Sequence, residues 1–96
     1  MRARQLFRYK ARQGEMICEM VIWSLPVSTP ERPHGLKYRL FCGQAGACVV
    51  RYDNETGKGD HRHHGDREEP YAFSSLEQLL ADFRADCSEL AGWRWE

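Results

Sequence analysis

The sequence has no hydrophobic segment long enough to cross a membrane. A transmembrane helix needs about 20 consecutive apolar residues, and no run in the 96-residue chain approaches that length. The first residues are basic, but the apolar stretch of a secretory signal peptide does not follow them. These absences predict a soluble, cytoplasmic protein that does not use a membrane as a partner.

The chain also lacks a net charge and paired cysteine motifs. Its 14 basic and 14 acidic residues cancel, so the composition does not indicate electrostatic capture of nucleic acid by the whole molecule. The four cysteines show no CxxC spacing and lie in apolar patterns. This pattern predicts buried thiols in the reduced form.

Basic residues are nevertheless concentrated at the N-terminus. Residues 1–14 contain no acidic residue and five basic ones: Arg2, Arg4, Arg8, Lys10 and Arg12. Such a segment can contact phosphates or an acidic partner. It can equally be a solvent-exposed edge strand that its charges protect from pairing with other chains.

Length and composition predict one domain over residues 1–96. With 42% hydrophobic residues, the chain can bury one modest core. Alternating apolar residues predict four strands that form two hairpins, at residues 6–10 and 15–25 and then at 37–42 and 47–52.

The C-terminal part has a helical pattern. Ser74 and Glu77 read as a capping box, and Gly92 is a natural helix stop. One apolar stripe follows the cap: Leu76, Leu79, Leu80, Phe83, Cys87 and Leu90. The predicted fold class is α+β: an antiparallel sheet of about four strands with one C-terminal amphipathic helix packed on it.

Between the last predicted strand and the helix lies a segment with nothing apolar to bury. Residues 53–69 contain no aliphatic residue but three histidines, His61, His63 and His64, among many charged groups. Three glycines interrupt any regular period. We predict a long polar loop over residues 51–73, and a loop of this kind in a small domain is usually functional.

Catalytic histidine chemistry is one interpretation of this loop. Two imidazoles can divide the roles of general base and general acid. RNA cleavage further needs a cation against the developing charge on phosphorus and benefits from an aromatic ring that stacks on a base. The candidate catalytic residues are His61, His63, Asp53, Lys58 and Arg62, and the candidate substrate-binding residues are Tyr52, Arg51, Arg67 and Tyr71.

Two other interpretations use the same residues. No cofactor is predicted. However, His61 and His63 could bind a divalent metal ion together with Asp53, Asp60 or Asp66. Their spacing matches no standard zinc pattern. In the third interpretation the acidic residues pair with Arg and His across a rigid loop, and the histidines are structural. His34, which lies among prolines, is predicted to be exposed.

Five blocks of the chain form a pattern that resembles one known family. They are Met20-Val21-Ile22-Trp23, Lys37-Tyr38-Arg39-Leu40, Arg51-Tyr52-Asp53-Asn54-Glu55 with Gly57-Lys58-Gly59-Asp60-His61-Arg62-His63, Glu68-Glu69-Pro70-Tyr71-Ala72-Phe73, and Leu76-Glu77-Gln78-Leu79-Leu80-Ala81-Asp82-Phe83. The family is TumE, the toxin component of prokaryotic TumE/TumA toxin–antitoxin pairs, and the likeness covers approximately residues 6–87. The resemblance implies a toxin with a helix-turn-helix antitoxin as its partner, and it carries no assignment of catalytic residues.

Two functional hypotheses follow. In the first, the protein is a ribonuclease toxin that acts on RNA through the His/Asp/Arg-rich loop. In the second, it is a non-catalytic interaction module that binds an antitoxin, nucleic acid or another protein through that loop and the basic N-terminus. Trp23, Trp93 and Trp95 favour the second hypothesis because aromatic residues are enriched at interfaces. A homodimer is also compatible with the sequence.

Overall fold

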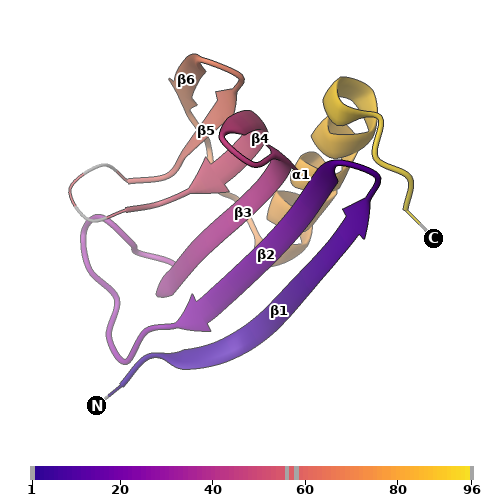
Figure 1. Ribbon diagram of the computed structural model, residues 1–96. Coiled ribbons are helices and arrows are strands. Elements are labelled where there is room, and N and C mark those ends of the chain that lie inside the picture. The colour runs from indigo at the N-terminus through magenta and orange to yellow at the C-terminus, as the bar shows by residue number, and fades with distance from the viewer. Residues whose placement is uncertain (1, 56, 58, 96) are drawn as a thin grey trace.

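The strands pair in chain order, so the sheet is an antiparallel meander (Figure 1). The computed structural model describes residues 2–55, 57 and 59–95. Within those residues the sheet has six strands and one helix follows it: β1 (Arg4–Gln13), β2 (Met16–Ser24), β3 (Leu36–Gln44), β4 (Ala47–Asp53), β5 (His61–His64), β6 (Arg67–Pro70) and α1 (Leu76–Ala91).

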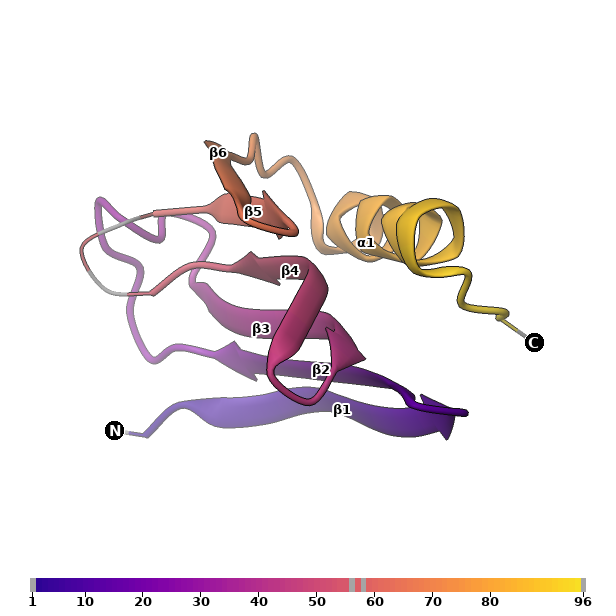
Figure 2. The ribbon, with the colours of Figure 1, turned by 45° about the horizontal axis from the view of Figure 1, so that its top comes forward.

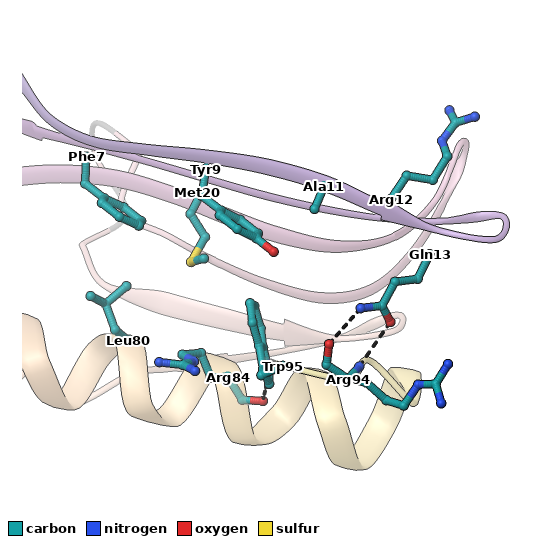
Figure 3. A pocket seen from close by; sticks show the side chains of 10 residues that line it. All are labelled: Phe7, Tyr9, Ala11, Arg12, Gln13, Met20, Leu80, Arg84, Arg94 and Trp95. Carbon is teal, nitrogen blue, oxygen red and sulfur yellow. Dashed lines mark hydrogen bonds between the residues drawn. The ribbon is translucent and has the colours of Figure 1, made fainter.

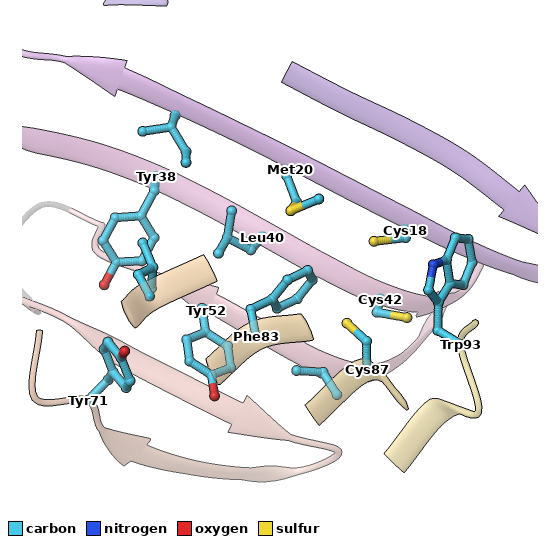
Figure 4. Close-up of a cluster of buried hydrophobic side chains, with 13 residues drawn as sticks. Cys18, Met20, Tyr38, Leu40, Cys42, Tyr52, Tyr71, Phe83, Cys87 and Trp93 are labelled. Carbon is cyan, nitrogen blue, oxygen red and sulfur yellow. The ribbon is translucent and has the colours of Figure 1, made fainter. Parts of the chain in front are cut away.

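The core lies between α1 and one face of the sheet. The helix packs against β3 and β4 (Figure 2). Alternate residues of β2, β3 and β4 point toward it, because successive side chains of a strand face opposite ways. Figure 4 shows these side chains meeting Phe83 and Cys87 of the helix. The buried hydrophobic residues are Cys18, Met20, Ile22, Tyr38, Leu40, Cys42, Val50, Tyr52, Tyr71, Leu79, Phe83, Cys87 and Trp93.

The other face of the sheet is not covered by α1, and we call it the open face. Residues paired directly across an antiparallel ladder lie on the same face, so the register identifies its members. They include Arg8, Lys10, Arg12, Ile17, Glu19, Val21, Trp23, Lys37, Arg39, Phe41, Arg51, Asp53, His61, His63 and Glu68. In Figure 3 the side chain of Arg12 points away from α1, whereas Phe7, Tyr9 and Met20 point toward it.

The sheet has six strands rather than the four that hydrophobic alternation predicts. The two additional strands, β5 and β6, fall inside the segment predicted as a loop, and they have hardly any apolar side chains. Polar side chains pair across them instead: Arg62 with Glu69, and His63 with Glu68. Gly65, at φ 61°, provides the left-handed residue of the tight turn between them.

The helix begins one residue later than its capping pattern predicts. The N-cap is Ser75, whose Oγ accepts a hydrogen bond from the Gln78 amide at 3.0 Å. The predicted box of Ser74 and Glu77 is therefore wrong by one position. At the other end Gly92 has φ 68°, as the sequence predicts for the C-terminal stop.

Within the described ranges, no helix combines the length and the apolar character that crossing a membrane requires.

Candidate functional site

Strands β4 and β5 bring two histidines and an aspartate together on the open face. Asp53 pairs with His61, and Arg51 pairs with His63 two residues further along the same ladder, on the same face. The His61 and His63 rings are 5.2 Å apart between centroids and meet edge to face. A polar segment that looks like a loop in sequence thus positions its side chains with the regularity of a strand.

Asp53 is the most deeply buried member of this cluster. Its side chain is 2% exposed, Oδ1 lies 2.5 Å from His61 Nε2, and Oδ2 lies 3.0 Å from Arg51 Nε. Within the described part of the chain, neither oxygen has a partner with hydrogen-bond geometry. The carboxylate is therefore held by charge between an imidazole and a guanidinium, in surroundings where charge interactions are stronger than in water.

His61 has both ring nitrogens engaged. Nδ1 lies 3.0 Å from the Gly59 carbonyl oxygen, and because a carbonyl only accepts, Nδ1 must carry a hydrogen. Nε2 faces Asp53. Because Nδ1 is bound to the Gly59 carbonyl, Nε2 is the ring nitrogen that can exchange a proton.

His63 is set up differently. Arg51 Nη2 lies 2.9 Å from its Nε2, and Glu68 Oε2 lies 3.0 Å from the same atom. Burial lowers the pKa of His63 below its usual 6.5, the positive charge of Arg51 lowers it further, and Glu68 opposes this shift. A guanidinium only donates, so Nε2 accepts its hydrogen bond in the neutral form. The two histidines therefore have different polar partners: a carboxylate at His61, and a guanidinium and a carboxylate at His63.

Arg51 is the cation of the cluster, and Arg62 is not. Arg62 lies on the α1 side of the sheet, where Nε donates to Glu69 at 2.9 Å and Nη1 donates to the Tyr52 hydroxyl at 3.3 Å. Placing it with His61 and His63 was wrong, because neighbouring residues of a strand point to opposite faces. Lys58, the other predicted cation, lies outside the described residues.

The predicted base-stacking rings are in the core. Tyr52 is fully buried and Tyr71 is 9% exposed, and their rings pack edge to face at 5.0 Å. Their hydroxyls donate to Asp86 and Asp82 of the helix. Neither ring has a face open to a nucleobase. Arg67 pairs with His64 and so belongs to the α1 side, away from the cluster.

A second polar cluster lies on that α1 side. Asp86 Oδ2 accepts from the Tyr52 hydroxyl and lies 2.8 Å from His64 Nε2. The Arg62 guanidinium lies 4.0 Å from the same oxygen. This cluster joins β4, β5 and α1, which gives it a structural role, and it separates His64 from the two histidines of the open face.

Asp60 and His34 bind each other away from the open-face cluster. Asp60 Oδ1 accepts from the Tyr38 hydroxyl at 2.6 Å and lies 3.1 Å from His34 Nε2. The His34 ring also packs on Phe73, with centroids 4.0 Å apart. The expectation that His34 is exposed was wrong, since its side chain is only 11% exposed.

Asn54 fixes the chain where it leaves β4, a role that sequence reasoning missed. Its Oδ1 accepts from the Tyr38 amide at 3.0 Å and its Nδ2 donates to the Leu36 carbonyl at 2.8 Å, so the side chain extends the pairing with β3. Its own carbonyl accepts from Arg32 Nη2 at 2.7 Å. An Asn directly after a predicted strand was the available signal.

Asp53, His61 and His63 are also the residues that could hold a divalent cation on the open face. One ligand atom from each lies within 4.8 Å of the others, and Asp60 is not part of this group in the described structure. However, Arg51 contacts both Asp53 and His63, so a metal ion would be placed beside an existing positive charge. The geometry therefore favours acid–base chemistry.

Two cavities help to locate the accessible surfaces. One of about 490 Å³ adjoins the cluster, and it is lined by Trp23, Lys37, Tyr38, Arg39, Asp53, Asn54 and Glu55. Another, of about 640 Å³, lies between β1 and α1 (Figure 3). No histidine or acidic residue is among the described residues that line the larger cavity, so it offers no acid–base pair.

Comparison with known proteins adds one result. Neither the curated proteins nor the solved structures contain a match to the chain. The family described as Toxin TumE matches residues 2–91 of the 96. The toxin-like pattern that the sequence carries therefore extends over almost the entire chain, and the protein belongs to the TumE toxin family.

Proposed function

We propose that this TumE-family toxin is an endoribonuclease whose active site is the cluster of Asp53, His61, His63 and Arg51. The observation that carries the proposal is the contrast between two adjacent histidines on one face. His61 Nε2 faces the buried carboxylate of Asp53, whereas burial and the charge of Arg51 lower the pKa of His63.

The reaction would be a transesterification within the RNA strand. His63 accepts the proton of a ribose 2′-hydroxyl, and the 2′-oxygen forms a bond to the adjacent phosphorus. His61 donates its Nε2 proton to the 5′-oxygen as the bond from that oxygen to phosphorus breaks. The products are a 2′,3′-cyclic phosphate and a 5′-hydroxyl end.

Arg51 would stabilise the charge that develops on the phosphorane oxygens. It is already within reach of both sides of the site, since it contacts Asp53 and His63. Asp53 would act on the substrate only through His61, by orienting its ring. This division of roles supplies a cation without requiring a metal ion.

Replacing the two histidines tests the proposal. We expect purified His61→Ala and His63→Ala each to cleave RNA about 10²- to 10⁴-fold more slowly, in the presence of a chelator as well as without it. His64→Gln is the matched control, because His64 lies on the same strand but on the α1 side. Circular dichroism verifies the fold, and growth inhibition in cells should follow the cleavage rates.

A folded His61→Ala/His63→Ala double variant that cleaves RNA at the wild-type rate would remove the cluster from the mechanism. Loss of activity only in the presence of a chelator would instead support the metal-dependent use of Asp53, His61 and His63.

A toxin family implies an antitoxin partner, and we propose that this partner is a helix-turn-helix protein. The alternative function, binding without catalysis, draws support from the groove between β1 and α1, which both aromatic and basic side chains line, and from Phe7, which is 39% exposed. Intact RNA after incubation with wild-type protein, together with tight antitoxin binding, would favour that alternative.

A further inference from the structure

We infer that the open face over β1–β4 binds single-stranded RNA, with one unstacked base in the cavity at Trp23. This inference rests on the proposed function, because it places the substrate of that same site.

Charge on the open face favours a phosphate backbone. The described open-face residues include six basic side chains and three acidic ones: Arg8, Lys10, Arg12, Lys37, Arg39 and Arg51 against Glu19, Asp53 and Glu68. This excess occurs in a molecule whose formal net charge is zero. Basic side chains therefore outnumber acidic ones on the sheet face that carries His61 and His63, although the whole chain has no net charge.

The basic N-terminal segment belongs to this surface. Its residues alternate along β1, so Arg8, Lys10 and Arg12 share the open face while Tyr9 and Ala11 face α1. All three basic side chains are exposed. They extend the positive surface from the centre of the sheet to its β1 edge.

The cavity beside Asp53 fits a nucleobase. Its volume is about 490 Å³, and Trp23 forms one wall as a half-buried indole. Lys37 Nζ lies 5.8 Å from the centroid of that ring, and Arg39 stands on the adjacent rung. A base can stack on the indole while these two cations contact the flanking phosphates.

The position of the cavity links binding to cleavage. Arg39 pairs directly with Asp53 across β3 and β4, and Asp53 contacts His61. A strand with one base at Trp23 thus runs over Arg39 to the histidines. A base held in this way must be unstacked from its neighbours, which a single strand permits and a duplex does not.

Binding to an inactive protein provides the test. We use His61→Ala/His63→Ala protein and a fluorescein-labelled single strand of about eight nucleotides, and we follow fluorescence anisotropy as salt rises. Adding Trp23→Ala should weaken binding about 5- to 100-fold, and Trp23→Phe should restore most of it. Trp95→Ala, on the α1 side, is the matched control and should leave the affinity unchanged.

A second variant tests the basic side chains of β1. Replacing Arg8, Lys10 and Arg12 together by Gln should lower the slope of log affinity against log salt by about 2, because each phosphate contact contributes about 0.7. Replacing Arg84 and Arg94, which line the groove on the α1 side, should leave the slope as it is.

The outcomes separate this inference from the proposed function. RNA cleavage by wild-type protein with equal affinity in the Trp23→Ala variant would overturn the inference alone. Trp23-dependent binding to RNA that wild-type protein leaves intact would uphold the inference and overturn the nuclease. Equal affinity for a duplex of the same sequence would also overturn the single-strand inference.

Discussion

At the scale of single residues, Arg51 supplies the positive charge of the open-face cluster. Its guanidinium is close to Asp53 through Nε and to His63 through Nη2. The same positive charge therefore balances a buried carboxylate and disfavours protonation of an imidazole. One residue thus contacts both His63 and the carboxylate that faces His61.

This balance predicts how the cleavage rate depends on pH. The neutral form of His63 increases as pH rises through its pKa, so kcat/KM should rise with a midpoint below 6.5. Glu68→Gln removes an anion that raises this pKa, so the midpoint should move to lower pH. Arg51→Gln removes a cation that lowers it, so the residual activity should have its midpoint at higher pH.

The midpoints of the wild-type, Glu68→Gln and Arg51→Gln proteins are measured from kcat/KM across the acid pH range. His64→Gln is the control and should leave the pH profile unchanged. Coincident midpoints for the Glu68 and Arg51 variants would show that His63 is not the titrating base.

At the scale of elements, β5 and β6 show which parts of the fold hydrophobic patterning can reveal. The predicted strands at residues 15–25, 37–42 and 47–52 fall within or largely overlap β2, β3 and β4, whose apolar side chains fill the core. Strands β5 and β6 contribute backbone pairing and polar side-chain contacts instead, and a pattern of apolar residues cannot reveal those. The turn residues Gly65 and Asp66 were the signal that was missed.

The missed strands also explain the errors in the predicted site. A loop imposes no alternation, so Arg62 was grouped with its neighbours His61 and His63. On a strand, alternation places Arg62 with Tyr52 on one face and the histidines with Arg51 on the other. The sequence could therefore name Asp53, His61 and His63 by their chemistry, but only the ladder could reveal their partners.

The start of α1 yields a prediction that distinguishes two adjacent serines. Because Ser75 Oγ bonds the Gln78 amide, Ser75→Ala should lower the free energy of unfolding by about 1 kcal/mol. Ser74→Ala is the matched control and should change it by much less. Urea denaturation measures both, and the reverse order of the two effects would place the cap at Ser74.

At the scale of the whole molecule, the sheet separates two polar clusters that share neighbouring residues of β5. His61 and His63 lie with Asp53 on the open face, whereas Arg62 and His64 lie with Asp86 on the α1 side. Each cluster has one aspartate at its centre. Under the proposed function, the open-face cluster carries the chemistry, and the other cluster attaches the helix to the sheet.

Matched substitutions of the two aspartates test this division. Asp86→Asn weakens the bonds from Tyr52 and His64, so it should destabilise the protein by about 1–3 kcal/mol while each folded molecule cleaves RNA at the normal rate. Asp53→Asn should slow cleavage about 10²-fold in protein that is still folded, because His61 loses the carboxylate that faces its Nε2 and orients its ring. Stability comes from urea denaturation, and rates are compared where both variants are folded. If folded Asp86→Asn loses cleavage and Asp53→Asn retains it, the reaction centre is the Tyr52, Asp86 and His64 cluster, and the open face only binds RNA.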